Sequence, residues 1–213
     1  MAGCCEPDGY DATFDDRFAR RLARRYGRRG LSRPSRAILS FLAERGIEGA
    51  TILEIGGGVG DIQVELLRHG AAAATNLEIS ANYEAEAAQL LDRLGLRDRV
   101  DRRFFDIARQ PEEVERADIV VLHRVVCCYP DYERLLAAAA SKATRLLVFS
   151  HPPRNLVTRM FMYWDNLLRR ARGEPFRTFA HPPLAMLDVL RRAGLRDTFR
   201  WRGRGWRVVG LER

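Results

Sequence analysis

The chain has 213 residues, of which 46% are hydrophobic and 30% charged, and its formal net charge at pH 7 is +8. This length suits one globular domain with a full hydrophobic core, so we expect residues 1–213 to form a single domain. No apolar stretch is long enough for a transmembrane segment, and the N-terminus lacks the basic start and apolar region of a signal peptide, which together predict a cytoplasmic protein.

Basic residues gather at both ends of the sequence. Residues 1–36 hold 9 arginines against 5 acidic residues, residues 154–213 hold 14 against 5, and the segment between them holds 13 basic and 18 acidic residues. Such basic flanks fit an anionic substrate, RNA or an anionic membrane surface, and a solvated arginine-rich face would give the same pattern. Because Lys142 is the only lysine among 36 basic residues, we expect a GC-rich, bacterial genome.

The first predicted element is a basic amphipathic helix that begins at Asp11 and stops at Gly27 and Gly30. Its apolar stripe recurs at every fourth position: Phe14, Phe18, Leu22 and Tyr26. A second helix is predicted over 32–45. We expect residues 1–46 to form a helical lid, although the first helix could instead lie on a membrane, contact RNA or simply pack on the domain.

Strands and helices then alternate along the chain. The predicted strands are 50–55, 73–79, 99–105, 117–123 and 143–150. The predicted helices between them are 61–69, 81–94 and 131–141, with a short helical turn near 111–115. Strands joined by helical crossovers predict an α/β fold with a doubly wound, mostly parallel sheet covered by helices on both faces. Such sheets bind ligands beyond the carboxyl ends of their strands.

The alternation ends at His151, which is followed by two prolines. Residues 155–172 predict a helix of bulky apolar residues, and 184–193 predict another helix. The last segment reads as a hairpin of two strands, 195–201 and 206–211.

The glycine turn after the first strand is the central motif. Glu54 is followed by glycines at alternate positions, Gly56, Gly58 and Gly60, and then by an amphipathic helix. Glycines allow positive φ angles and let a ligand lie against the backbone at a helix N-terminus, although they could also serve only a tight turn. The dinucleotide fingerprint G-x-G-x-x-G would need its third glycine where Asp61 stands.

The pattern E-x-G-x-G-x-G resembles motif I of the class I S-adenosylmethionine-dependent methyltransferases, and the resemblance extends over residues 45–150. It implies a Rossmann-like, seven-stranded sheet with an antiparallel last strand. It also implies that Glu54 and the three glycines shape the methionine pocket, that Glu78 after the second strand binds the ribose hydroxyls, and that Asp106 after the third strand binds adenine. A carboxylate suits the ribose because it can accept two hydrogen bonds at once. In these terms residues 47–150 form the cofactor-binding core, 151–183 a substrate-side insertion, and 184–213 the final helix and hairpin.

Three residues are candidates for the substrate side. His123 and His151 end strands four and five, and imidazole titrates near neutrality, so each could take a proton from the nucleophile. Either could equally be a satisfied structural histidine. Tyr129, in the loop after strand four, could hold the substrate. A carboxylate substrate would need no base.

The sequence therefore predicts an S-adenosylmethionine-dependent methyltransferase that acts on a small anionic or aromatic molecule by in-line displacement. The helix 155–172, rimmed by arginines, would suit a flat apolar substrate bearing acids, or would simply cap the core. The middle of the chain is also loosely similar to magnesium-protoporphyrin O-methyltransferases. The alternatives are an RNA methyltransferase of the same fold and a non-catalytic, cofactor-binding or membrane-associated module.

Cysteines occur as two adjacent pairs, Cys4-Cys5 and Cys127-Cys128. The C-x-x-C spacing of zinc and thioredoxin sites does not occur, so we expect buried or incidental thiols and no metal. The two pairs could bind a soft metal only if the N-terminal segment brought them together.

Overall fold

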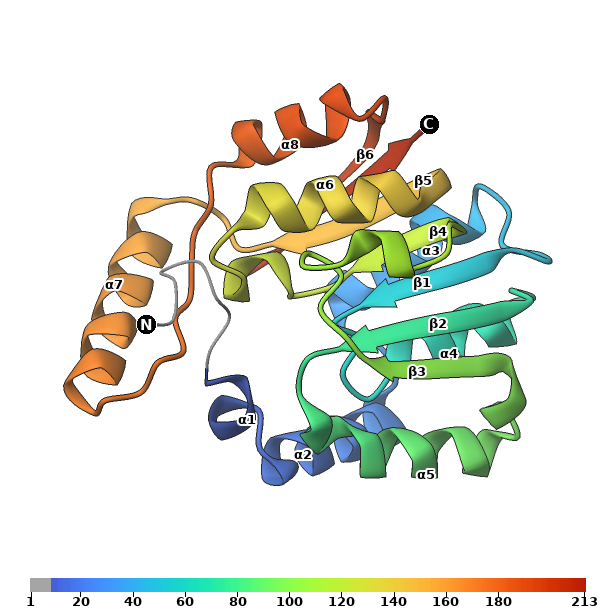
Figure 1. Cartoon of the computed structure of the whole chain (residues 1–213), viewed down its shortest axis with the longest axis horizontal. Coiled ribbons are helices and arrows are strands. Elements are labelled where there is room, and N and C mark those ends of the chain that lie inside the picture. The colour runs from blue at the N-terminus through green and yellow to red at the C-terminus, as the bar shows by residue number, and fades with distance from the viewer. Residues whose placement is uncertain (1–8) are drawn as a thin grey trace.

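The computed structural model describes residues 9–213, in which a seven-stranded sheet runs through the centre of the molecule (Figure 1). The strands are β1 (Thr51–Ile55), β2 (Ala73–Glu78), β3 (Val100–Phe104), β4 (Ala117–Leu122), β5 (Ala143–His151), β6 (Arg196–Arg202) and β7 (Arg207–Glu212). Their order is β3-β2-β1-β4-β5-β7-β6. Strands β1 to β5 are parallel, and β7 runs antiparallel to both β5 and β6. The predicted Rossmann-like α/β sheet with an antiparallel last strand is confirmed.

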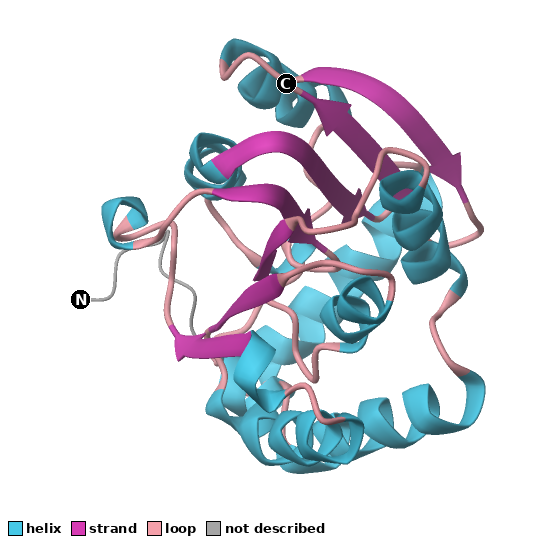
Figure 2. Ribbon diagram, turned by 90° about the vertical axis from the view of Figure 1, so that its right-hand side faces the viewer, coloured by secondary structure: helices cyan, strands magenta, loops and turns pink. Residues whose placement is uncertain are grey.

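Helices cover both faces of this sheet (Figure 2). They are α1 (Tyr10–Thr13), α2 (Asp16–Arg29), α3 (Arg33–Ala43), α4 (Asp61–Arg68), α5 (Glu84–Leu94), α6 (Tyr132–Lys142), α7 (Leu156–Ala171) and α8 (Pro183–Arg192). Short 3₁₀ turns lie at Ala81–Tyr83, Arg97–Arg99, Pro111–Glu113 and Val126–Cys128. Among the described residues, no helix combines the length and the hydropathy that a membrane span requires.

Two cores form because the central strands are apolar on both faces. Leu53 of β1 packs with residues of α6 and α8, whereas its neighbour Ile52 packs with residues of α3 and α4. The same alternation holds in β4, where Val120 and Ile119 enter opposite cores. Alternate side chains of a strand point to opposite faces, so continuous apolar runs are what a doubly covered parallel sheet needs.

The N-terminal helix differs from the prediction because it is interrupted between Thr13 and Asp16, which divides it into α1 and α2. Asp15 lies in this interruption. This residue caps α2 by accepting a 2.8 Å hydrogen bond from the backbone N–H of Phe18. The small residues Ala19 and Ala23 are buried, whereas the Phe18 side chain is 42% exposed. Of the predicted stripe, Tyr26 is buried and Phe14 and Leu22 pack beside the two alanines, so only Phe18 departs from it.

Candidate active site

The glycine turn between β1 and α4 lies directly beneath the loop that follows β4. Gly56 and Gly58 have positive φ angles of 63° and 56°. A Cβ atom on Gly56 would lie 2.5 Å from Cγ2 of Val125, which belongs to that loop. Only glycine combines this backbone conformation with so close an approach. The turn is therefore packed closely against the loop after β4, with Gly56 and Gly57 half-buried and Gly58 buried.

Glu78, at the carboxyl end of β2, is buried and holds the glycine turn in place. Its Oε2 accepts a 2.9 Å hydrogen bond from the Gly58 N–H, and its Oε1 accepts bonds from the N–H groups of Ile79 (2.8 Å) and Ser80 (3.2 Å). Burial raises the pKa of Glu78, and these backbone bonds oppose the rise. A carboxylate offers about four acceptor positions, so binding both hydroxyls of a ribose requires one of these three bonds to open or be shared.

Arg102 of β3 secures the same turn from the other side. Its Nη2 donates a 2.9 Å hydrogen bond to the carbonyl oxygen of Gly58. Its Nη1 is buried and has no hydrogen-bond partner among the described residues. An unsatisfied guanidinium nitrogen beside a glycine cradle fits a site that a polar ligand completes.

Asp106, after β3, is paired with Tyr129 from the loop after β4. The Tyr129 hydroxyl donates to Oδ2 of Asp106 at 2.9 Å, and the Ala108 N–H donates to Oδ1 at 3.0 Å. Burial, and then the neighbouring Asp106 charge, raise the pKa of Tyr129. The structure thus brings together one residue expected at the adenine and another expected at the substrate.

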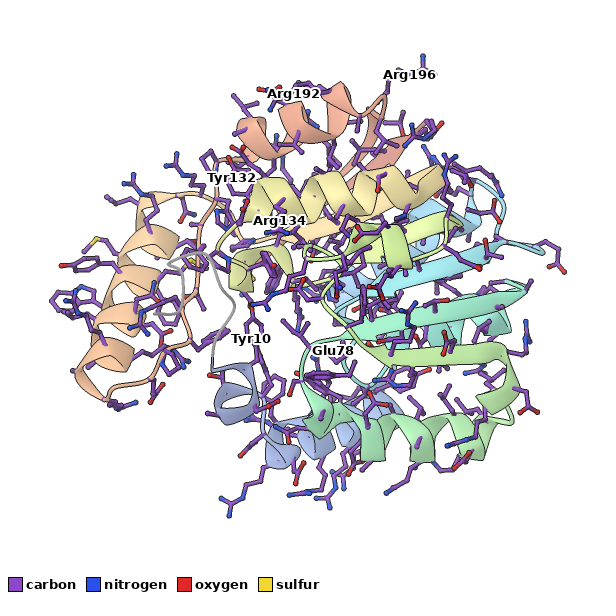
Figure 3. The ribbon with its side chains drawn as sticks, in the orientation of Figure 1. Tyr10, Glu78, Tyr132, Arg134, Arg192 and Arg196 are labelled. Atoms are coloured by element: carbon purple, nitrogen blue, oxygen red, sulfur yellow. The ribbon has the colours of Figure 1, made fainter. Side chains whose placement is uncertain are left out.

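Helix α1 covers the carboxyl ends of β2 and β4 through Tyr10, a residue that sequence reasoning missed. Its hydroxyl donates to the backbone carbonyl of Cys128, and Tyr10 and Glu78 lie at the same end of the sheet (Figure 3). The next residue, Asp11, accepts a 2.7 Å bond from the hydroxyl of Ser80. Tyr10 lies four residues before Phe14 and so continues the every-fourth spacing, but the predicted helix begins only at Asp11.

Glu54 lies fully inside the protein under the glycine turn. Its Oε2 accepts a 3.2 Å hydrogen bond from the Gln63 N–H at the start of α4. Burial, and then repulsion from Asp61, raise the pKa of Glu54 to about 8. A Cβ atom on Gly57 would lie 2.8 Å from the Glu54 carboxyl carbon, so this side chain supports the turn from beneath. Its contribution to a methionine pocket stays a prediction.

His123 has both ring nitrogens within hydrogen-bonding distance of serine hydroxyls. Nδ1 lies 2.9 Å from Oγ of Ser150, and Nε2 lies 3.3 Å from Oγ of Ser35. Burial, and then the adjacent Arg124, lower the pKa of His123 to about 3. A ring so engaged joins α3, β4 and β5, which favours a positioning role over that of a base.

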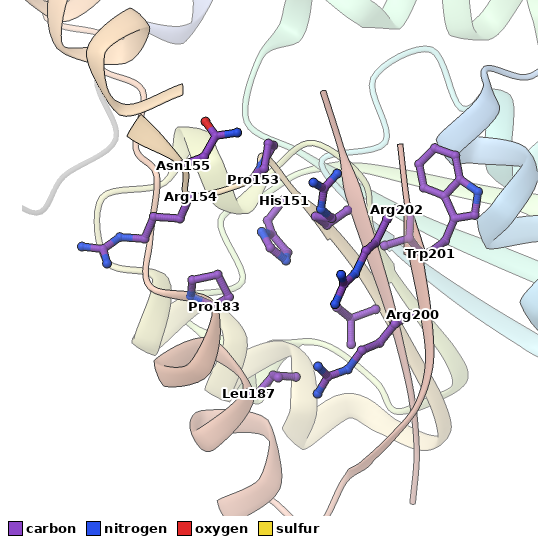
Figure 4. A pocket seen from close by; sticks show the side chains of 12 residues that line it. His151, Pro153, Arg154, Asn155, Pro183, Leu187, Arg200, Trp201 and Arg202 are labelled. Carbon is purple, nitrogen blue, oxygen red and sulfur yellow. The ribbon is translucent and has the colours of Figure 1, made fainter. Parts of the chain in front are cut away.

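His151 lines a cavity of about 310 Å³ between the end of β5, the hairpin and the start of α8 (Figure 4). Its Nδ1 lies 2.8 Å from the Pro152 carbonyl oxygen, to which it donates, so in the neutral ring Nε2 carries the lone pair. Burial lowers the pKa of His151, and Arg207 lowers it further. Four arginines also line the cavity: Arg154, Arg200, Arg202 and Arg207.

The described cysteines make no metal site. Cys127 and Cys128 have Sγ atoms 3.6 Å apart, and no group of three potential metal ligands occurs within residues 9–213. Cys4 and Cys5 lie outside the described residues, so the structure does not describe whether the two pairs meet.

The sheet order and the glycine turn held by Glu78 are those of class I methyltransferases. Residues 18–198 match the family model of the methyltransferase domain, and the chain belongs to this family. It is therefore a methyltransferase, as the resemblance to the class I S-adenosylmethionine-dependent enzymes implied. No curated protein matches the sequence.

Solved structures of similar fold include several methyltransferases. Magnesium protoporphyrin IX methyltransferase from Synechocystis PCC 6803, with bound SAH, is 20% identical, with a TM-score of 0.74 over 95% of this chain and 96% of that one. An O-methyltransferase family protein from Burkholderia thailandensis is 18% identical, with a TM-score of 0.71 over 96% of this chain and 62% of that one. Human N-acetylserotonin methyltransferase, in complex with SAM, is 17% identical, with a TM-score of 0.67 over 96% and 59%.

Proposed function

We propose that this methyltransferase binds S-adenosylmethionine at the carboxyl ends of β1 to β3 and methylates a small anionic molecule. The observation that carries the cofactor site is the buried Glu78 carboxyl, bonded to Gly58 of the glycine turn at 2.9 Å. The glycine backbone would face the amino-acid part of the cofactor, Glu78 its ribose, and Asp106 its adenine. The cofactor supplies a methyl group already activated on a sulfonium, for transfer by in-line displacement.

The cavity beside His151 supports an anionic substrate. Arg154, Arg202 and Arg207 supply positive charge that a carboxylate or phosphate can pair with, whereas Arg200 is already paired with Asp197. The cavity volume of about 310 Å³ suits a small molecule. The unprotonated Nε2 of His151 can accept a proton from a hydroxyl or amine nucleophile. A carboxylate nucleophile would need only the arginines, which would orient it and hold its charge.

The cofactor assignment is tested by Glu78→Gln, which keeps the shape of the side chain and removes its charge. We expect S-adenosylmethionine to bind at least tenfold more weakly by calorimetry, because an amide offers one acceptor oxygen where a carboxylate offers two. Glu112→Gln, at an exposed glutamate, is the matched control. Circular dichroism checks that both variants fold. Unchanged affinity in Glu78→Gln would overturn the assignment.

RNA remains the second candidate substrate because α2 carries a groove lined by arginines alone. Its volume is about 550 Å³ and its lining comprises Arg17, Arg20, Arg21, Arg24, Arg25, Arg28 and Arg29. Labelled methyl transferred into a bacterial lysate separates the two candidates. Label in the small-molecule fraction supports the proposal, whereas label lost on RNase treatment would assign the arginine groove to RNA.

A further inference from the structure

Helix α7 is turned so that its polar side faces the protein. Its least exposed residues recur at helical spacing and lie on one side: Thr158, Met162, Asp165, Asn166 and Arg169. None of the helix's residues is buried. In a helix that packs on its own domain, the apolar stripe faces the core, so this helix has the reverse arrangement.

Hydrogen bonds fix this rotation of the helix. The Asn166 amide exchanges two bonds with the backbone of Thr178, its Nδ2 donating at 2.8 Å and its Oδ1 accepting at 2.9 Å. Arg169 pairs with Asp165 at 2.9 Å and with Glu174 at 3.0 Å, and its guanidinium lies 5.0 Å from the ring centre of Phe176. Phe176 is buried, so α7 is anchored to the domain through its polar side.

The opposite side of α7 exposes a continuous apolar surface, which we call the outer face. It consists of Leu156, Val157, Met160, Phe161, Tyr163, Trp164, Leu167 and Leu168. The side chains of Val157 and Phe161 are 77% and 70% exposed. Figure 1 shows α7 at the edge of the molecule, away from the sheet. Large exposed apolar surfaces mark interaction sites, and the aromatic residues Tyr and Trp favour the boundary between membrane and water.

The charges around the outer face indicate a negatively charged partner. Arg159 and Arg170 are exposed and form no ion pair within residues 9–213. The nearby acids, Asp165 and Glu174, are both paired with Arg169. Two copies joined through this face would bring their arginines together without acids to neutralise them. An anionic lipid surface supplies the missing negative charge along with an apolar layer.

We propose that α7 docks this protein on anionic lipid membranes, with its outer face in the boundary between headgroups and acyl chains and its arginines on the lipid phosphates. The helix lies in the membrane surface and does not cross it. This places the protein at the source of any substrate that partitions into lipid. The inference stands independently of the methylated substrate, because it concerns binding of the protein to a surface.

The test is sedimentation of the full chain with vesicles of phosphatidylcholine alone or mixed equally with phosphatidylglycerol. We expect binding to the mixed vesicles, weakened at least tenfold in Phe161→Ser/Trp164→Ser and reduced by high salt. Phe104→Ser is the matched control, because Phe104 is also 70% exposed but lies on β3. Trp164→Phe, which keeps an apolar ring, should retain binding.

Three outcomes would overturn the proposal. The first is absence of binding to the mixed vesicles. The second is equal loss of binding in Phe104→Ser, or loss only when Arg20 and Arg24 of α2 are replaced by serine. The third is a stable dimer of the wild type by light scattering that Phe161→Ser/Trp164→Ser dissociates, which would assign the outer face to a second copy. Calorimetric binding of S-adenosylmethionine by the same variants, expected to be unchanged, separates this proposal from the proposed function.

Discussion

The hydroxyl of Tyr129 donates a 2.9 Å hydrogen bond to Oδ2 of Asp106, so the two residues act as one unit. We expect Tyr129→Phe to raise the KM for S-adenosylmethionine about tenfold and to change kcat little, because the carboxylate loses a donor that fixes its direction. Tyr132→Phe, which removes a hydroxyl bonded only to its neighbour Glu133, is the control. A rise confined to the KM of the methyl acceptor would instead place Tyr129 at the substrate.

Mutations of His123 and His151 should have different effects. We expect His151→Asn to lower kcat a hundredfold or more with a hydroxyl or amine substrate, since it removes the proposed base. His123→Asn should lower the melting temperature and leave kcat within a few fold, because it disturbs the bonds to Ser35 and Ser150. Steady-state kinetics and thermal unfolding of both variants check this. Full activity in both would indicate a nucleophile that needs no base.

Glu54 should make stability depend on pH. Its pKa is about 8 in the folded protein against an ordinary 4.5, so the folded state binds a proton that the unfolded state releases. This proton therefore adds to the free energy of unfolding, fully below pH 4.5, and the contribution is lost as the pH rises through 8. It amounts to a few kcal/mol at most. Glu54→Gln cannot titrate and should lack this decline.

The comparison of wild type with Glu54→Gln is made by urea unfolding at several pH values. The difference between the two proteins is the measured quantity, because His123 acts in the opposite direction. Its pKa is lowered to about 3, so its own contribution is lost as the pH falls below 6.5 towards 3. Parallel stability curves for the two proteins would show that Glu54 is ionised at neutral pH.

Gly56→Ala should both destabilise the protein and weaken cofactor binding. The positive φ alone costs about 1–2 kcal/mol, and the added methyl group would lie 2.5 Å from Cγ2 of Val125. Gly49→Ala is the control, because Gly49 has a φ of 68° and nothing within 4 Å of its Cβ position. Adding Val125→Ala should restore part of the loss in Gly56→Ala, and none of the loss in Gly49→Ala. Equal melting temperatures for the two single variants would contradict the contact.

Local patterns were sufficient to predict the framework of the fold. The strands β1 and β4 are largely apolar, whereas β2 and β3 contain polar and charged residues, and the alternate glycines after Glu54 predicted the turn between β1 and α4. Both signals lie within a few neighbouring residues. The place of the last strand followed only from the family resemblance, since nothing within 206–211 specifies its neighbours in the sheet.

The partners of the site residues could not be predicted because they are distant in sequence. His123 bonds to Ser35 and Ser150, and no spacing connects these three positions. Likewise, the amphipathic pattern of α7 predicts an apolar stripe, but it does not indicate whether this stripe packs on the domain or contacts a partner. At α2 the every-fourth pattern included Phe18, which is exposed, and left out Ala19 and Ala23, which are buried.

The insertion of β7 between β5 and β6 also constrains the order of assembly. Strand β6 pairs with β7 alone, so it cannot join the sheet until β7 has left the ribosome. The glycine turn, Glu78 and Asp106 all precede β5 and can assemble earlier. A nascent chain would thus gain the proposed pocket for the methyl donor first, and the arginine-lined cavity only after β7 has been synthesised.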